Sequence, residues 1–234
     1  MISIIIPCFN EENTIAAILN KVLMADTLGF KKQIIVVNDG SSDQSLMEMK
    51  KFLPEIQILN FQKNHGKGHS VRAALETCEG QYILIQDADL EYDPADYSKL
   101  LKEIIKNDAM VVYGARNREH LSFKTRMTLF YAGGIILTKM ANFLYRSKLT
   151  DIHTCYKLFN ADAIRGVAFK SNRFEICHEM TAYFLNNKIQ IKEVPITYFP
   201  RAFSEGKKIR WQDGVHGAWT LIGNKFTGQK RKRP

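Results

Sequence analysis

The sequence has little of what marks a secreted or membrane-spanning protein. It contains four cysteines and no C-x-x-C pair, so we expect reduced thiols rather than a disulfide framework. The opening residues MISIIIPCFNEE lack the basic region and the cleavage site of a signal peptide. The uncharged stretch Met127–Thr138 is far shorter than the roughly 20 apolar residues of a spanning helix. These absences predict an intracellular, cytoplasmic protein without a transmembrane helix.

Acidic residues are scarce in one part of the chain only. Lys and Arg number 33 against 24 Asp and Glu, a formal net charge of +9. Residues 199–234 hold nine of the basic and two of the acidic residues, so the first 198 residues are nearly neutral. A basic chain is one mark of a nucleic-acid-binding protein, but the neutral body disfavours that alternative and predicts no nucleic-acid partner. A hydrophobic fraction of 45% excludes wholesale disorder.

Ile- and Val-rich runs alternate with helical patterns in the first 115 residues. We expect strands at residues 2–6, 33–38, 56–60, 81–86 and 109–114. We expect helices at residues 12–28, 44–53, 70–78 and 96–106. This alternation is typical of an α/β fold, here a mainly parallel sheet with helices on both faces. Because ligands of such sheets bind at the carboxyl ends of the strands, the residues that follow each strand form the candidate site.

The pattern changes after residue 115. Residues 121–150 contain five basic residues and no acidic one around LFYAGGIILTKMANFLY, which predicts a long helix. Two interpretations stay open for it: an amphipathic helix on anionic lipid, or a core or dimer-face helix with snorkelling basic ends. A short helix is expected at residues 211–221. We expect one domain over residues 1–225 and a basic tail at 226–234, which is either a weak membrane anchor or a solubilising segment.

Aromatic and acidic residues follow the first two predicted strands. The segment Pro7-Cys8-Phe9-Asn10-Glu11-Glu12 could grip a nucleobase and its ribose, or could simply begin a helix. The second strand is followed by Asn38-Asp39-Gly40-Ser41-Ser42-Asp43. There Gly40 provides the turn and the last three residues can cap a helix, which leaves the Asp39 side chain free for a ligand.

Three carboxylates follow the fourth predicted strand, in Asp87-Ala88-Asp89-Leu90-Glu91. In an extended chain these carboxylates point to one side, where Mg²⁺ or Mn²⁺ could bridge them to a diphosphate. The alternative is a solvated acidic turn. After the third strand, Asn64-His65-Gly66-Lys67-Gly68 could place backbone N–H groups and the Lys67 ammonium beside a phosphate, although an ordinary loop explains it as well.

The ordered set of these motifs resembles a known family. Pro-x-Phe-Asn-Glu-Glu, Asn-Asp-Gly-Ser-Ser-Asp and Asp-Ala-Asp resemble the nucleotide-sugar half of family-two glycosyltransferases, which have the Rossmann-like GT-A fold. Residues 114–116, 150–157 and 201–208 resemble the branch of dolichol- and polyprenol-phosphate mannose or glucose synthases. The resemblance covers residues 2–215. It implies a nucleotide-sugar-binding half over 1–115 and an acceptor half over 116–225.

The resemblance also implies roles for single residues. The nucleoside of a UDP- or GDP-sugar would be bound by Pro7, Phe9, Glu11 and Asp39. The metal ion, Mg²⁺ or Mn²⁺, would be held by Asp87, Asp89 and Glu91. Cations around the donor and acceptor phosphates would be Arg116, Arg126, Arg201, Lys207 and Lys208, with Lys67 as a further candidate. Catalytic roles fall to Asp89, Arg116 and Arg201.

The implied reaction is a single displacement with inversion, from the nucleotide-sugar to a polyprenyl or dolichyl phosphate. The enzyme would bind the cytoplasmic face of a membrane peripherally, as a monomer or a homodimer. An ionised lipid phosphate needs no base. A saccharide acceptor in cell-envelope polysaccharide synthesis is the alternative. It would need a general base, for which the candidates are Asp89, Asp151, Glu175 and Glu179.

A zinc site is disfavoured because the spacing of its possible ligands matches no familiar pattern: His153, Cys155, Cys177 and His178.

Overall fold

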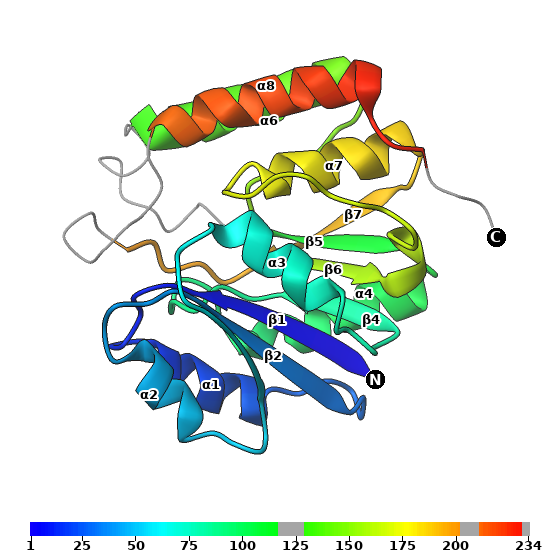
Figure 1. Cartoon of the computed structure of the whole chain (residues 1–234). Helices are drawn as coiled ribbons and strands as arrows, with labels where there is room; N and C mark the ends of the chain where they lie inside the picture. Colours follow the sequence, from blue (N-terminus) through cyan, green and yellow to red (C-terminus); the bar gives the residue numbers. More distant parts are fainter. Residues whose placement is uncertain (117–128, 202–210, 231–234) are drawn as a thin grey trace.

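A computed structural model describes residues 1–116, 129–201 and 211–230 of the chain (Figure 1). Its sheet has seven strands in the order β3-β2-β1-β4-β6-β5-β7. The strands are β1 Ile2–Cys8, β2 Lys32–Asp39, β3 Gln57–Phe61, β4 Tyr82–Ile85, β5 Val111–Arg116, β6 Lys157–Asn160 and β7 Ile191–Ile196. All paired strands are parallel except β6, which is antiparallel to both β4 and β5. The predicted mainly parallel α/β sheet is therefore confirmed.

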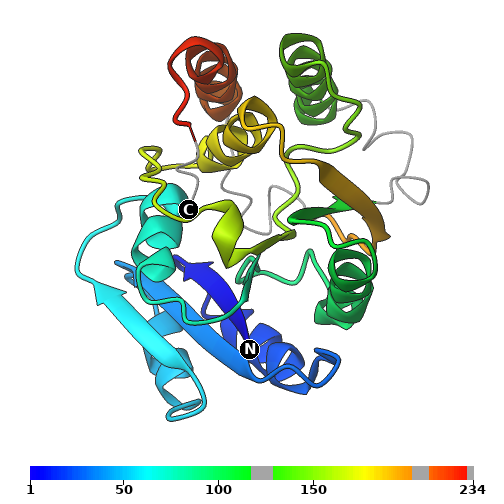
Figure 2. The same ribbon diagram turned by 90° about the vertical axis from the view of Figure 1, so that its right-hand side faces the viewer.

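Helices cover both faces of this sheet. They are α1 Ile15–Met24, α2 Ser45–Lys50, α3 Lys67–Leu75, α4 Tyr97–Lys106, α6 Leu129–Tyr145, α7 Ile176–Asn186 and α8 Trp211–Thr227, with single turns η1 Pro94–Asp96 and η2 Ala161–Ala163. Figure 2 shows α1, α2 and α4 on one face and α3 and α7 on the other. Helices α6 and α8 lie side by side as a further layer over α7. None of the helices in the described part of the chain is long and apolar enough to span a bilayer.

The core is built by the apolar runs that predicted the strands. The side chains of β1 from Ile2 to Ile6 are fully buried, and so are the apolar residues in the middle of β2. Strands buried on both faces leave no polar face to water, which is why these runs lack the alternation of an exposed strand. The buried strands therefore set the points from which the loops at the carboxyl edge of the sheet begin.

Several predicted boundaries are wrong, and the loops explain why. The helix expected at 12–28 is shorter, because residues 10–12 bond to the loop after β2 instead. Helix α3 begins at Lys67, three residues earlier than expected. Helix α8 continues to Thr227, so the first two residues of the expected basic tail are helical. The long helix expected at 121–150 is observed as α6 over 129–145, and residues 117–128 lie outside the described residues.

A pair of histidines, of which His178 is buried, joins the outer layer to α7. The rings of His153 and His178 are in edge contact, with centroids 4.8 Å apart. A Cβ atom on Gly217 of α8 would lie 2.5 Å from Cε1 of His178, so only glycine lets α8 approach this closely. His153 Nε2 lies 3.2 Å from the carbonyl oxygen of Gly134 in α6. The contact therefore depends on two uncharged rings packed between three helices.

We expect Gly217→Ala to lower the free energy of unfolding by about 1–3 kcal/mol, because the added methyl group overpacks against the buried ring of His178. Gly223→Ala on the same helix is the matched control, since a Cβ there meets no atom within 4 Å. Alanine is the better helix former by about 1 kcal/mol, so this control should be neutral or stabilising. Chemical denaturation of both variants measures the difference, and equal behaviour would contradict the packing argument.

The stability of the protein should fall in mild acid. Burial lowers the pKa of His153 to about 4, so the folded chain leaves it neutral where the unfolded chain protonates it below about 6.5. The unfolded state then binds more protons, and the free energy of unfolding decreases as the pH drops from about 6.5 to about 4. We expect His153→Asn to show a shallower decrease in urea unfolding across this window. The same slope in both proteins would argue against a neutral buried ring.

Candidate active site

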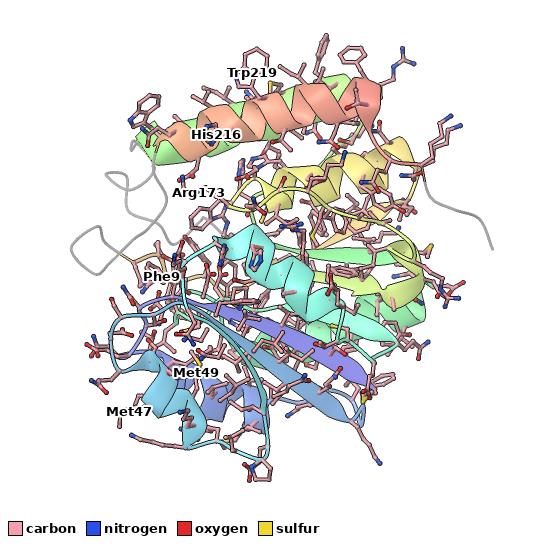
Figure 3. All side chains as sticks on the ribbon, in the orientation of Figure 1. Phe9, Met47, Met49, Arg173, His216 and Trp219 are labelled. Atoms are coloured by element: carbon pink, nitrogen blue, oxygen red, sulfur yellow. The ribbon has the colours of Figure 1, made fainter. Side chains whose placement is uncertain are left out.

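The loops that follow β1 and β2 are bonded to each other at the carboxyl edge of the sheet. The N–H of Asn10 donates to Ser41 Oγ at 3.0 Å, and the N–H of Glu11 donates to Ser45 Oγ at 2.8 Å. In the other direction, the N–H of Ser42 donates to Asn10 Oδ1 at 2.8 Å. These bonds hold Phe9 and Glu11 at the end of β1, where Figure 3 shows Phe9 near the edge of the sheet. Two of the predicted nucleoside-binding residues thus lie in a loop that is held in place by hydrogen bonds to the loop after β2.

Asp39 is not free, contrary to the prediction. Its Oδ1 accepts the N–H of His65 at 2.9 Å and its Oδ2 accepts the N–H of Gly66 at 2.7 Å. The residue is 2% exposed. Because Asp39 accepts these two N–H groups, it fixes the residues that precede α3. This explains why the helix begins at Lys67. The sequence pattern around Asp39 carries no signal for these partners, since they lie 26 and 27 residues further on.

Lys67 forms an ion pair with Asp87, between the start of α3 and the end of β4. Its Nζ donates to Asp87 Oδ1 and lies 3.5 Å from Cys155 Sγ. Burial acts to lower the pKa of Lys67, but Asp87 together with Cys155 and Cys177 raises it. Burial likewise acts to raise the pKa of Asp87, and Lys67 keeps it lowered. Both groups are therefore charged in the folded protein.

The three carboxylates after β4 do not lie on one side of an extended strand, as the sequence predicted. That expectation is wrong because β4 ends at Ile85 and the chain bends at residues 88–91. Asp87 turns to Lys67, whereas Glu91 accepts the hydroxyl of Tyr198 and the N–H of Arg201, each at 2.9 Å. Among the described residues no group of three His, Cys, Asp or Glu side chains is arranged to hold a metal ion. The predicted third metal ligand, Glu91, thus serves the segment after β7 in this structure.

Arg201 joins two of the acidic loops. Its Nη1 and Nη2 donate to the two carboxylate oxygens of Glu11 at 3.0 and 3.1 Å, and Nη2 also donates to Asp89 Oδ2 at 2.8 Å. Burial, followed by the charges of Asp87 and Glu91, raises the pKa of Asp89 to about 7, against the opposing effect of Arg201. Negative charge is therefore crowded here. The structure brings together Glu11, Asp89 and Arg201, which are up to 190 residues apart in sequence.

A second arginine lies beside this cluster. Arg116, the last residue of β5, donates from Nε and Nη2 to the two oxygens of Asp151 at 2.6 and 2.8 Å. Its guanidinium carbon lies 5.0 Å from the centre of the Tyr198 ring. Because the Tyr198 hydroxyl donates to Glu91, this ring connects the environments of both arginines. Burial acts to lower the pKa of Arg116, but Asp151 together with Tyr92 and Tyr198 raises it further, so the group is a permanent cation.

Sequence reasoning assigned no role to Lys157, although it is fully buried. Its Nζ donates to the carbonyl oxygens of Ile152 and Thr154 at 3.0 and 2.6 Å and lies 4.1 Å from the centre of the Tyr113 ring. These bonds shape the loop that presents Asp151 to Arg116. A lysine inside the apolar run CYKLFN is a signal that could have identified it.

The predicted general bases differ in their surroundings. Asp151 is paired with Arg116. Glu175 and Glu179 accept backbone N–H groups of residues 170–173. Burial, followed by the charges of Asp87 and Glu91, raises the pKa of Asp89 to about 7. The four residues weighed for zinc do not gather in one place, since Cys155 lies by Lys67 and not by the two histidines. All four cysteines of the chain are free thiols.

The remaining predicted residues are of two kinds. Pro7 lies within β1, where it pairs with Val37 of β2. The other three lie outside the described residues: Arg126, Lys207 and Lys208.

Comparison with known proteins gives a consistent result. The model of the family described as "Glycosyl transferase family 2" matches residues 3–167. A low-salt glycan biosynthesis hexosyltransferase of Haloferax volcanii is 30% identical over 208 residues, which are 86% of this chain and 48% of that protein. A UDP-N-acetylglucosamine–dolichyl-phosphate N-acetylglucosaminyltransferase of Methanococcus voltae is 26% identical, and the match covers 84% of each chain. The chain thus spans about half the length of the first relative and most of the second.

Solved structures resemble the whole fold at low identity. Glucosyl-3-phosphoglycerate synthase from Mycobacterium tuberculosis in complex with UDP superposes with a TM-score of 0.73 at 13% identity, covering 97% of this chain and 79% of that one. The same enzyme with Mn²⁺, UDP and glucosyl-3-phosphoglycerate gives a TM-score of 0.72 at 13% identity, covering 97% and 80%. Identity this low shows a common fold and carries no residue assignments.

Proposed function

The chain belongs to glycosyl transferase family 2 and has the Rossmann-like GT-A fold, and from this premise we propose that it moves a sugar from a UDP- or GDP-linked donor to a polyprenyl or dolichyl phosphate. The observation that carries the proposal is the contact of Arg201 with Glu11 and Asp89. It brings a cation from the acceptor half to the carboxylates at the ends of β1 and β4. The name of the Methanococcus voltae relative supports a lipid-phosphate acceptor.

The donor would lie along the carboxyl ends of β1, β2 and β4. We assign its nucleoside to Pro7, Phe9 and Glu11, and we give the fourth predicted residue, Asp39, an indirect role. Glu11 has carboxylate oxygens suited to ribose hydroxyls, and the loop pair around it is already fixed by hydrogen bonds. Asp39 would act by holding the start of α3, and Lys67 with it, rather than through a free carboxylate.

The carboxylates after β4 fit a divalent cation. Mg²⁺ is commonly bound through one or two carboxylates together with substrate phosphates, so Asp87 and Asp89 suffice without a third protein ligand. Burial and the neighbouring charges of Asp87 and Glu91 raise the pKa of Asp89, and a bound cation would relieve the repulsion among these charges. The ion would supply Lewis-acid stabilisation of the departing diphosphate. Glu91 stays a prediction as a further ligand.

The chain's own residues would do the rest by charge and position. Arg201 and Arg116 are cations at the acceptor side of the carboxylate cluster, where they can neutralise the donor and acceptor phosphates. A lipid phosphate is largely ionised at neutral pH, so it can attack the anomeric carbon directly and with inversion. Positioning of the two reactants then contributes much of the rate enhancement.

A saccharide acceptor is the second candidate, because one observation favours it. A hydroxyl nucleophile needs a general base with a pKa near the working pH. Asp89, with a pKa of about 7 when no ion is bound to it, meets that requirement, and in this candidate it would act as the base rather than as a metal ligand. The two candidates differ in the acceptor and in the role of Asp89, and an acceptor comparison separates them.

The test is a two-step assay with the purified chain. Hydrolysis of UDP- and GDP-sugars in the presence of Mn²⁺ first identifies the donor. Transfer from that donor is then compared between undecaprenyl or dolichyl phosphate in detergent and a panel of free sugars. Transfer to the lipid phosphate supports the proposal, transfer to sugars supports the second candidate, and no turnover of any donor contradicts both.

We expect EDTA to abolish turnover and added Mn²⁺ or Mg²⁺ to restore it. Without the ion, the diphosphate would depart beside the carboxylates of Asp87 and Asp89, and repulsion would raise the barrier. Initial rates before and after chelation measure the effect, with Ca²⁺-loaded EDTA as a control for nonspecific inhibition. Full activity in chelator would mean that the lysine and arginine pairs alone stabilise the leaving group.

A further inference from the structure

The outer side of α8 carries a continuous apolar stripe. Five of its large apolar side chains are exposed: Trp211, Val215, Trp219, Ile222 and Phe226. At 100° per residue these positions fall within an arc of about 80°. The opposite side of the helix, with Gly217 and Leu221, is buried. Figure 3 shows Trp219 on the side of α8 that faces away from the sheet. Since the exposed fractions of Trp219 and Phe226 are 68% and 81%, this stripe has no partner among the described residues.

Helix α6 extends the apolar surface. It lies alongside α8, and the Tyr145 hydroxyl donates to the carbonyl oxygen of Leu221 at 2.6 Å. Ile136 and Phe143 of α6 are 64% and 85% exposed. The two helices thus form one layer with large apolar side chains on its solvent side, which we name the α6/α8 face. Monomeric soluble proteins rarely expose apolar patches of this extent unless the patch binds something.

Basic side chains surround this face. Those exposed on or next to the two helices are Lys139, Arg146, Lys148, Lys225 and Lys230. Among the described residues of α6 and α8 the only acidic one is Asp213. Lys139 lies between Ile136 and Phe143 on the exposed side of α6. The occupant of the face must therefore accept apolar side chains and carry negative charge next to them.

We propose that the α6/α8 face seats the protein on the surface of a bilayer that contains anionic lipid. Tryptophan and phenylalanine enter the boundary between headgroups and acyl chains, and the surrounding lysines and arginines bind anionic headgroups. A second copy of the chain fits less well, because pairing two such faces would bring the basic side chains of both together. The surface is inferred from exposure and charge alone. Its use, to bring the enzyme to a lipid-linked acceptor, rests on the proposed function.

The position of the face suits that use. Helix α8 begins ten residues after Arg201, which contacts Glu11 and Asp89 at the carboxyl edge of the sheet. In Figure 1 the first turn of α8 lies at the same end of the molecule as the loops after β1 and β2. A bilayer on the α6/α8 face would therefore reach the end of the molecule at which the carboxylates gather, with α7 between that face and the sheet.

The chain carries its own probe for this inference. It has two tryptophans, Trp211 and Trp219, and both belong to the stripe. We expect the tryptophan emission of the full chain to shift to shorter wavelength on vesicles of phosphatidylcholine mixed with phosphatidylglycerol. Brominated lipids should quench it. Vesicles of phosphatidylcholine alone should give a weaker shift, and high salt should reduce binding to the anionic vesicles.

A matched pair of variants ties binding to the face. Trp219→Ser combined with Phe226→Ser should lower cosedimentation with anionic vesicles about tenfold or more. Met47→Ser removes an exposed apolar side chain from α2, far from the face in Figure 3, and should bind as the unchanged protein does. Circular dichroism melting verifies that each variant is folded.

Three outcomes would overturn the inference: no binding of the unchanged protein to any vesicle, equal loss in both variants, or a dimer in solution whose tryptophans are already shielded. Hydrolysis of the nucleotide-sugar without lipid separates this result from the proposed function. If donor hydrolysis and transfer in detergent are normal while vesicles are not bound, the inference alone fails. If vesicles are bound and no donor is turned over, the proposed function fails instead.

Discussion

Replacing Asp89 with asparagine is expected to lower the rate of sugar transfer by about 10³-fold. The proposed function makes Asp89 a metal ligand, and an uncharged amide binds Mg²⁺ or Mn²⁺ more weakly than a carboxylate does. The ion contributes several kcal/mol to the transition state, and about 1.4 kcal/mol corresponds to a factor of ten in rate. Initial rates at saturating donor and Mn²⁺ measure the loss.

The same substitution should leave the fold at least as stable. Burial and the neighbouring charges of Asp87 and Glu91 raise the pKa of Asp89 to about 7. In the unfolded chain this group ionises near a pH of about 4, so above pH 7 its ionisation destabilises the folded state relative to the unfolded one. Asparagine removes this repulsion, while Arg201 retains its two bonds to Glu11. We expect an unchanged or higher melting temperature at pH 8. A large drop would mean that loss of activity reflects unfolding.

Asp93→Asn is the matched control for the rate. It makes the same chemical change four residues further on, where the carboxylate accepts the N–H of Ala95 and lies 3.5 Å from Lys21. We expect its transfer rate to stay within about twofold of the unchanged enzyme. Near-normal turnover in Asp89→Asn, or an equal loss in Asp93→Asn, would remove the support for a metal at this position.

The largest effect on stability is expected from Asp151→Ala. Both oxygens of the buried Asp151 accept hydrogen bonds from Arg116, whose side chain is itself only 17% exposed. Removing the carboxylate leaves the Arg116 guanidinium unpaired and with little access to water. Breaking a buried ion pair in this way lowers the free energy of unfolding by about 3–5 kcal/mol. Urea denaturation of both proteins gives the difference in the free energy of unfolding.

Asp162→Ala supplies the comparison for that measurement. Its carboxylate pairs with Arg165, but both side chains are more than half exposed. Surface pairs contribute little, so the loss should stay below about 1 kcal/mol. Should Asp151→Ala cost no more than Asp162→Ala, the Arg116 pair would be a surface-like contact, and its proposed role as a fixed cation in the site would lose its basis.

The positions of the strands and most of the candidate residues could be predicted from the sequence. The runs Ile2–Ile6 and Gln33–Asn38 are apolar because both faces of the sheet are covered, and that requirement is visible within a few neighbouring residues. The strand ends then located Glu11, Asp39 and Asp87 at one edge. The antiparallel strand β6 could not be predicted this way, because its pairing depends on a return of the chain from beyond residue 150.

The partners of the charged side chains could not be predicted either. Asp39 was expected to be free, yet it caps α3 through residues of the next loop. The carboxylates after β4 were expected on one side, yet the strand ends early and they turn to different partners. In both cases the hydrogen-bond partners belong to segments far along the chain, which the pattern of neighbouring residues does not reveal.

By itself, then, the sequence determined the α/β class, the positions of the first five strands along the chain and the residue types that follow them, because burial of a strand is encoded by its own residues. The tertiary structure alone decided that Arg201 meets Glu11 and Asp89, that Arg116 is held by Asp151, and that the tryptophans of α8 face outward. Such contacts join segments far apart in the chain. Their geometry follows from how whole layers pack, and no short window of sequence contains it.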